Sequence, residues 1–351
     1  MEITGVVQKQ AWLDGVLPPV EEVRPGLWSI PVPLPNSPLR YVLVYALEGQ
    51  SGVTLVDAGW DTAESWSALL GGLETAGFTI EDVRGVLVTH LHPDHYGLAG
   101  RVREASGAWV ALHPADAELL RGRYLDFESL VTAVRRQMAE HGVPSDISSG
   151  LADASRSVLP LVRHTEPEIL LEDGQRAPAE GWDLRVVWTP GHSPGHVCFQ
   201  DVRNGLLLSG DHILPRITPA IGMHPQAQGD PLGEFFASLE KVRGLDVAEV
   251  LPAHEYRFAG LDDRVGALLE HHGRRLTEIA EAVAVEPAGT TAWDLAGRLT
   301  WSRPWTQIEP FMRRSAMLET LAHLVVLEKT GRVRKAGGSG AGPCLWLPPE
   351  D

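Results

Sequence analysis

The chain has 351 residues, of which 44% are hydrophobic and 22% are charged, and its formal net charge is −16 at pH 7. This composition is typical of globular proteins and predicts a full core, in one large domain with an appendage or in two ordinary domains. The negative charge argues against non-specific binding to nucleic acid or to an anionic membrane. Fourteen histidines accompany only two cysteines, Cys198 and Cys344, which are too few for a disulfide framework.

The chain begins with Met1-Glu2-Ile3-Thr4, which has neither the basic nor the apolar region of a signal peptide. No run of about 18 apolar residues follows, so no membrane-spanning helix is predicted. We therefore expect a cytoplasmic protein.

The first part of the chain alternates strands and helices. Residues rich in Val, Leu and Tyr predict strands at 41–47, 53–56, 83–88 and 109–112. Helices are predicted from an N-cap at Asp61 to about Gly77 and over 98–105. From Pro114 to Arg163 the strand pattern stops and apolar residues recur at helical spacing. We interpret this stretch as a helical insertion, either a wall of the active site or a purely structural helix pair.

The second part returns to strands and then changes to helices. Strands are predicted at 184–188, 196–201 and 206–209, a helix at 232–243 and a short strand at 250–251. Past residue 262 we predict helices at 265–283, 291–299 and 313–328 and a closing hairpin from 333–335 and 344–347. The predicted domains are therefore 1–262, with the insertion at 114–163, and a C-terminal winged-helix-like domain at 263–351.

A candidate metal site begins where the strand at 83–88 ends. His90 and His92 are two apart in an extended segment, so they point the same way and can hold one ion together. Asp94 and His95 follow where the chain turns into a helix, and they can face a second ion. Imidazole and carboxylate groups are suitable ligands for zinc, and also for iron or manganese.

Three more strands end in candidate ligands. His192 follows the strand at 184–188 in a tight Pro-Gly turn, Asp211 follows Ser209-Gly210, and His254 follows the strand at 250–251. A scattered His is usually a surface residue, but a series of His and Asp at successive strand ends predicts a metal centre. Asp211 could bridge two cations.

These motifs together resemble the metallo-β-lactamase superfamily over about residues 20–260. The resemblance implies an α/β fold, an αββα sandwich with its site at one edge of the two sheets, so that residues 1–262 would be the catalytic domain. Asp57, in Leu55-Val56-Asp57-Ala58-Gly59, matches the first motif, in which the Asp orients the site. The run from His90 to His95 matches the second motif, and His192, Asp211 and His254 match the other three.

Carried over residue by residue, the resemblance implies a dinuclear site. The first metal ion would be held by His90, His92 and His192, and the second by Asp94, His95 and His254, with Asp211 bridging the two. The implied cofactors are two zinc ions, with iron or manganese as alternatives.

At some motif positions this chain differs from particular branches of the superfamily, and these differences indicate which branch it resembles. His92 stands where flavodiiron proteins have Glu, and Asp211 stands where class B1 lactamases have Cys. Persulfide dioxygenases use one iron with a similar motif set, but they lack a tail like this one. The chain thus resembles the group of glyoxalase II, lactonases and related thioesterases, although the glutathione-binding basic residues of glyoxalase II have no clear counterpart.

The implied activity is hydrolysis of a small-molecule ester, thioester or lactone by a metal-bridging hydroxide, since a bound metal lowers the pKa of water from about 15.7 to roughly 7. Asp94 is the candidate catalytic residue for handling the proton. His196 and His212 stand beside ligands and are expected to orient them. Tyr256 and Glu255, directly after the last ligand, are candidate residues of the substrate pocket.

Two other functions stay open. A hydrolase domain with a winged-helix-like tail also resembles an endoribonuclease of the same superfamily, so cleavage of RNA or another phosphodiester is the alternative. A winged-helix regulator with an inert metal domain is the third, although the complete ligand set argues against it. Residues 263–351 contain eleven Lys and Arg and eleven Asp and Glu, which is weak support for nucleic-acid binding. We expect a small-molecule substrate, no nucleic-acid or membrane partner, and a tail that packs on the first domain or on the second subunit of a homodimer.

Overall fold

The computed structural model describes residues 1–226, 229–338 and 342–350. Its contacts divide the chain into two compact units: residues 1–120, 158–219 and 238–266 form unit 1, and residues 121–157, 220–237 and those from 267 onwards form unit 2. At residues 237–238 and again at residues 266–267 the chain passes from one unit to the other inside a helix. This division differs from the predicted domains, because most of the insertion groups with the C-terminal segment and not with the first domain.

Unit 1 is built on two β-sheets. In spatial order, the seven-stranded sheet consists of β2 (Glu21–Arg24), β3 (Leu27–Pro33), β4 (Tyr41–Gly49), β5 (Gly52–Val56), β6 (Val83–Leu87), β7 (Trp109–Leu112) and β8 (Ile169–Leu170). In spatial order, the six-stranded sheet consists of β1 (Glu2–Ile3), β13 (Phe258–Ala259), β12 (Glu249–Pro252), β11 (Leu206–Gly210), β10 (Val197–Asp201) and β9 (Leu184–Trp188). One buried cluster combines Leu43 and Tyr45 of β4 with Phe199 of β10 and Leu208 of β11, so the core lies between the sheets.

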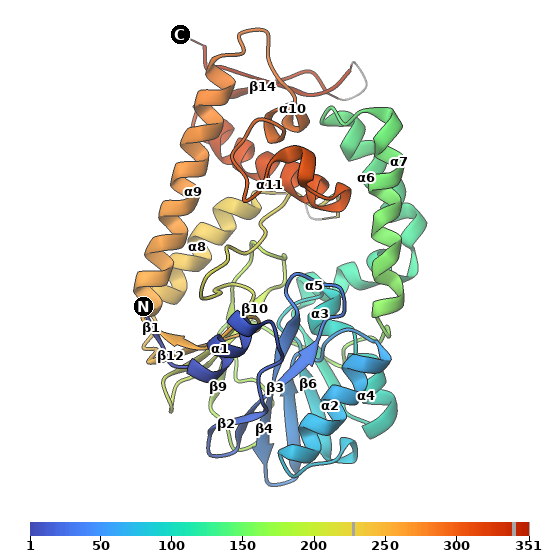
Figure 1. Ribbon diagram of the computed structural model, residues 1–351, viewed down its shortest axis with the longest axis vertical. Coiled ribbons are helices and arrows are strands. Elements are labelled where there is room, and N and C mark those ends of the chain that lie inside the picture. Colours follow the sequence, from blue (N-terminus) through green and yellow to red (C-terminus); the bar gives the residue numbers. More distant parts are fainter. Residues whose placement is uncertain (227–228, 339–341, 351) are drawn as a thin grey trace. The chain divides into compact units, whose positions relative to one another are not determined.

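Five helices belong to unit 1 alone: α1 (Val6–Asp14), α2 (Ala63–Thr75), α3 (Pro93–Tyr96), α4 (Ala99–Ser106) and α5 (Pro114–Leu120). Helix α2 packs on β3, and α4 packs on β6 and β7, so both cover the seven-stranded sheet (Figure 1). The N-cap of α2 is Thr62, whose side chain accepts a hydrogen bond from Ser65 N. The prediction of Asp61 as the cap was wrong by one residue, because the Asp61 carboxylate pairs instead with Arg101 at 3.2 Å.

Parallel strands bring the predicted ligands to one edge of each sheet. Strand β6 runs parallel to β5 and β7, and β11 runs parallel to β12. The loops that follow parallel strands leave from the same edge of a sheet, which is where ligands bind in open α/β sheets. The alternation of β6 and β7 with helices, and the β10–β11 hairpin, confirm the predicted elements of this region.

Unit 2 combines the insertion with the C-terminal segment. It contains α6 (Phe127–Glu140), α7 (Ser145–Asp153), α10 (Ala292–Ala296), α11 (Pro310–Lys329), β14 (Arg334–Ala336) and β15 (Leu345–Leu347), while α8 (Pro231–Arg243) and α9 (Leu261–Ala284) each have one end in either unit. Helix α7 packs on α6 and α11, and α10 packs on α11. Further helical turns occur at Ile80–Asp82, Arg121–Leu125, Ala154–Leu161 and Trp305–Gln307.

Backbone hydrogen bonds explain this grouping. Cys344 N donates to Glu140 O at 2.7 Å, and Trp293 N donates to His141 O at 3.2 Å, so the end of α6 is bonded to two C-terminal segments. The predicted closing hairpin is confirmed, with Arg334 opposite Leu347. No helix in the described part of the chain combines the length and the apolar character needed to cross a membrane.

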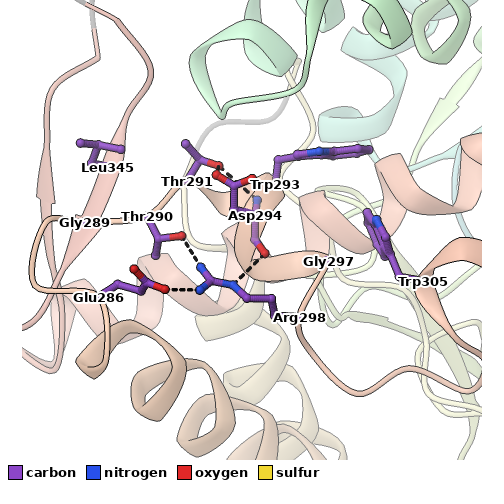
Figure 2. A pocket seen from close by; sticks show the side chains of 10 residues that line it. All are labelled: Glu286, Gly289, Thr290, Thr291, Trp293, Asp294, Gly297, Arg298, Trp305 and Leu345. Carbon is purple, nitrogen blue, oxygen red and sulfur yellow. Dashed lines mark hydrogen bonds and ion pairs between the residues drawn. The ribbon is translucent and has the colours of Figure 1, made fainter.

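A pocket of about 550 Å³ lies in unit 2 (Figure 2). The rings of Trp293 and Trp305 meet edge to face on one side of it, with centroids 5.3 Å apart. On another side Arg298 pairs with Glu286 and donates to Thr290 Oγ1 at 2.6 Å. Because these polar groups bond to one another, they stabilise the connection between α9 and α10.

An ion-pair network joins the two sheets of unit 1. Glu249 in β12 pairs with Arg257 at 2.6 Å and with Arg24 in β2 at 2.7 Å, and Arg257 also pairs with Glu21 in β2 at 2.5 Å. The side chains of Arg257 and Glu249 are only 5% and 4% exposed, whereas that of Arg24 is 46% exposed. Glu249 thus pairs with one buried arginine, Arg257, and with one solvated arginine, Arg24.

We predict that Arg257→Met lowers the free energy of unfolding by about 3–5 kcal/mol, because it leaves a buried carboxylate with only a solvated partner. Arg24→Ala should cost no more than about 1 kcal/mol, as expected for an exposed pair. Urea denaturation of both variants, followed by tryptophan fluorescence, measures the difference. Equal losses would show that burial does not set the strength of this network.

Candidate metal centre

All seven predicted metal ligands lie in unit 1, at the ends of strands. They are positioned by the segments after β6 (His90, His92, Asp94, His95), β9 (His192), β11 (Asp211) and β12 (His254). Asp94 and His95 lie in α3, whose first residue is Pro93. The structure therefore brings together residues that are as much as 164 positions apart in the chain, from His90 to His254.

The first group of ligands consists of three imidazoles. The candidate ligand atoms of His90, His92 and His192 all lie within 4.8 Å of one another. His90 Nε2 and His92 Nδ1 are 2.9 Å apart. Three ring nitrogens that meet in this way are a common protein ligand set for a catalytic zinc ion.

The second group contains a carboxylate. Asp94, His95 and His254 also have ligand atoms within 4.8 Å of one another. Asp94 Oδ2 lies 3.4 Å from His254 Nε2 and 3.7 Å from His95 Nε2. The two histidine side chains are fully buried.

Asp211 lies between the two groups and faces both. Its Oδ2 atom is 3.5 Å from His192 Nε2 in the first group. Its Oδ1 atom is 3.5 Å from His95 Nε2 and 3.3 Å from His254 Nε2 in the second. The two oxygens of one carboxylate are thus directed at different sets of ring nitrogens.

The unsatisfied atoms of this cluster fit a cation. His95 Nε2, His254 Nε2 and Asp211 Oδ1 are buried and have no hydrogen-bond partner among the residues that the structure describes. Such atoms are rare in folded proteins and are often explained by an ion. Burial by itself would lower the pKa of His95, but the carboxylates of Asp211, Asp57 and Asp94 raise it well above the usual value. The negative charge here attracts a positive ion, which a divalent metal would supply.

The first group has the opposite electrostatics, and it also fits a metal. Burial lowers the pKa of His90 well below the usual value, and the neighbouring rings of His95, His92 and His192 lower it further. The His90 ring is therefore neutral at pH 7. A neutral imidazole is the form that binds a metal ion.

Hydrogen bonds on the far side of the ligands fix their orientation. Asp57 has a left-handed backbone conformation, with φ 63°, and its Oδ2 accepts a hydrogen bond from His95 Nδ1 at 2.8 Å. Thr89 N donates to Asp57 Oδ1 at 2.8 Å. His254 Nδ1 donates to Tyr41 O at 2.8 Å. Since the Nδ1 atoms are used in this way, both Nε2 atoms face the site.

His196 and His212 are fully buried beside the ligands. His196 Nε2 accepts a hydrogen bond from Asp211 N at 3.1 Å, and its Nδ1 donates to Thr189 Oγ1 at 2.8 Å. His196 therefore holds the backbone of the carboxylate that lies between the two groups. Burial lowers the pKa of His212 to about 3, so its ring is neutral.

Glu255 and Tyr256 follow the last ligand. Glu255 has φ 70° and is fully buried, and its carboxylate accepts hydrogen bonds from Arg216 N at 3.1 Å and Arg216 Nε at 2.9 Å. Tyr256 is 6% exposed, and burial together with the charge of Glu255 raises its pKa. The Glu255 carboxylate joins the loop after β11 to the loop after β12, and a contact of either residue with substrate stays a prediction.

Three residues that support the ligands were not predicted from the sequence. Thr89 and Thr189 each stand at the end of a strand that leads to a ligand, and that position is a signal that could have found them. Tyr41 contributes through its backbone carbonyl. Every residue has a carbonyl, so no feature of the sequence could have pointed to this one.

The chain belongs to the metallo-beta-lactamase superfamily, whose family model matches residues 37–254, more than half of its length. The probable metallo-hydrolase YqjP of Bacillus subtilis is 26% identical over 312 residues, which cover 86% of this chain and 91% of that protein. A crystal structure of a metallo-beta-lactamase family protein from Thermus thermophilus is 31% identical, has a TM-score of 0.78 and covers 93% of this chain and 100% of its own. Over a shorter stretch of 144 residues, 39% of this chain and 42% of the other, the chain is 28% identical to an atrochrysone carboxyl ACP thioesterase of Cryptosporiopsis sp.. Family, relatives and the His and Asp clusters support a metal-binding hydrolase.

The glycine before Asp211 provides a test of how tightly the site is packed. Gly210 has φ 51°, and a Cβ atom there would lie 2.7 Å from His196 Nε2 and 2.9 Å from Thr89 Cβ. Gly205, in the β10–β11 turn, has φ 62°, but the nearest atom to its Cβ would be Ala248 Cβ at 3.4 Å. The two glycines share the backbone strain and differ in the collision.

We predict that Gly210→Ala abolishes stoichiometric metal binding, because the methyl group displaces His196 and with it Asp211. Gly205→Ala should keep its metal and lose only about 1–2 kcal/mol from the left-handed backbone. Metal content by mass spectrometry and unfolding by urea measure both effects. A Gly210→Ala protein with full metal content would contradict the proposed packing.

Proposed function

We propose that this protein is a dinuclear metal-dependent hydrolase that cleaves a small-molecule ester, thioester or lactone. Within the superfamily we place it in the group that resembles glyoxalase II, lactonases and related thioesterases. The observation that carries the proposal is the position of Asp211, whose two oxygens face different groups of ligands. A carboxylate in this position is suited to bridge two cations.

Each group of ligands would hold one ion, the first through His90, His92 and His192 and the second through Asp94, His95 and His254. Nitrogen and oxygen ligands of this kind suit zinc, and iron or manganese are alternatives. When bound, such ions lower the pKa of a water molecule from about 15.7 to roughly 7 and polarise a carbonyl group.

The chain's own residues fix the ligands and handle the proton. Asp57 and the carbonyl of Tyr41 orient the rings of His95 and His254, and His196 holds the backbone of Asp211. The Asp94 side chain is 12% exposed, whereas those of His95 and His254 are fully buried, so Asp94 is more accessible than these two ligands of its group. Its Oδ2 atom faces the two histidines, and we assign Oδ1 to accept the proton of the attacking water.

The substrate class is proposed from one relative and from the charge of the C-terminal segment. One relative is named as a thioesterase, and this is consistent with an acyl substrate. In the C-terminal segment α9, α10 and α11 are followed by the β14–β15 hairpin, which is the order of a winged helix, and we propose that this segment is winged-helix-like. Its equal numbers of acidic and basic residues favour a small-molecule substrate over RNA.

Metal content tests the dinuclear part of the proposal. We predict about two transition-metal ions per chain by elemental analysis, and loss of one or both in Asp211→Ala, because removal of the carboxylate leaves neither group with its shared ligand. Asp173→Asn is the control, since Asp173 pairs with Lys241 outside the ligand set. A single iron in the wild-type protein would instead indicate oxygen chemistry.

A substrate panel tests the reaction. We expect the purified protein to hydrolyse members of a panel of thioesters, lactones and esters, and we expect Asp94→Asn and metal-free protein to lose this turnover. Labelled single-stranded RNA and duplex DNA, the latter in a shift assay, are run in parallel. Turnover of RNA alone, abolished by Asp94→Asn, would refute the substrate class, and DNA binding without any turnover would refute an enzyme altogether.

A further inference from the structure

Asp116 joins the two loops that carry the first group of ligands. It lies in α5 and is fully buried. Its Oδ2 atom accepts hydrogen bonds from Leu91 N and from Ser193 Oγ, each at 2.8 Å. Its Oδ1 atom accepts a hydrogen bond from Gly195 N at 2.7 Å.

Each of these donors is next to a residue of the metal centre. Leu91 separates His90 from His92, and Ser193 directly follows His192. One oxygen atom thus bonds to the loop after β6, in one sheet, and to the loop after β9, in the other. Gly195 directly precedes His196, whose ring accepts a hydrogen bond from Asp211 N. The Oδ1 atom of Asp116 therefore holds the loop after β9 at a second point, next to His196.

Asp116 and Gly195 are in close contact. A Cβ atom on Gly195 would lie 2.5 Å from Asp116 N and 2.7 Å from Asp116 Cγ, so only glycine can bring its N–H this close. Trp188, at the start of the same loop, is also held in place. Its ring stacks on His113 with centroids 5.0 Å apart, and its Nε1 donates a hydrogen bond to Pro194 O at 2.9 Å.

The energetics of this contact favour a rigid connection. Hydrogen bonds to an ionised carboxylate are shorter and roughly twice as strong as those between neutral groups. If the carboxylate is removed, two buried backbone N–H groups lose their acceptor, and the cost of burying them is no longer offset by a hydrogen bond. The loops would then relax to find other partners, and the ring nitrogens that they carry would separate.

We propose that Asp116 is a positioning residue that holds the loop of His90 and His92 and the loop of His192 at the separation that a metal ion needs. It is in none of the groups of candidate metal ligands, and it would act through Leu91, Ser193 and Gly195. The proposal rests on the function proposed above, because it concerns the metal affinity of that same site. The new element is that a residue of α5, outside the five motifs of the family, raises the affinity of this site for metal.

The test compares three variants of the full-length protein. Asp116→Asn keeps the shape of the side chain but removes its charge and one acceptor. Ser193→Ala removes one of the donors and leaves the carboxylate in place. The matched control is Asp201→Asn. Asp201 is also buried, at 1% exposure, and accepts hydrogen bonds from Arg203 N and from both nitrogens of Asn204. These bonds stabilise the β10–β11 turn before Leu206 and not a ligand loop.

Competition with a chromogenic chelator measures the Kd for Zn²⁺, and the absorption spectrum of the Co²⁺-substituted protein reports the ligand geometry. We expect Asp116→Asn to raise the Kd by about 10–100-fold, the usual effect of losing a group that orients metal ligands. Ser193→Ala should raise it by less, and Asp201→Asn should leave it unchanged. The Tm of the metal-free protein should fall in both Asp variants, since both lose buried hydrogen bonds.

A role of Asp116 in folding alone would lower the Tm without a change in the Kd or in the Co²⁺ spectrum, and this result would overturn the proposal. If Asp116→Asn does not fold, Ser193→Ala tests the proposal in its place. An unchanged Kd in that variant would then overturn the proposal as well. Failure of the proposed function is distinct, because the wild-type protein itself would then bind no metal.

Discussion

The buried ring nitrogens and carboxylates at the edge of the two sheets constrain everything packed around them. An imidazole has two nitrogens, and a hydrogen bond to the one on the far side fixes the ring so that the other faces the site. In this way Asp57 bonds to His95 Nδ1 and the carbonyl of Tyr41 bonds to His254 Nδ1. The same arrangement leaves His95 Nε2 and His254 Nε2 without a hydrogen-bond partner in the described part of the chain, and a cation beside them would satisfy both atoms.

The site depends on the contact between the sheets as well as on its own residues. His90 and His92 follow β6 in the seven-stranded sheet, whereas the other imidazole of their group, His192, follows β9 in the six-stranded sheet. The core between the sheets and the network around Glu249 therefore set the distance between the ligands. Asp116 acts at closer range, because its carboxylate bonds to the segments on both sides of the gap. A cavity or a broken ion pair in unit 1 would thus affect metal binding without touching a ligand.

Unit 2 shows how a chain can form a compact body from distant segments. Residues 121–157, 220–237 and the C-terminal segment belong to it, and the chain enters and leaves partly within α8 and α9. Hydrogen bonds from Cys344 and Trp293 to the end of α6 connect segments more than a hundred residues apart. The helical pattern of 114–163 was visible in the sequence, but its association with the C-terminal helices depends on these long-range bonds.

Patterns along the chain were enough to predict most of the strands from β4 onwards, the closing hairpin and the positions of the candidate ligands. They were enough because strand patterns are local and because His and Asp stood directly after predicted strands, where parallel strands share an edge. Three features could be seen only in the folded chain: residues 121–157 belong to unit 2, the backbone carbonyl of Tyr41 orients a ligand, and Asp116 connects two ligand loops. These features depend on which surfaces meet. A carbonyl group is present in every residue and a buried Asp in a short helix resembles a surface one, so only the fold distinguishes them.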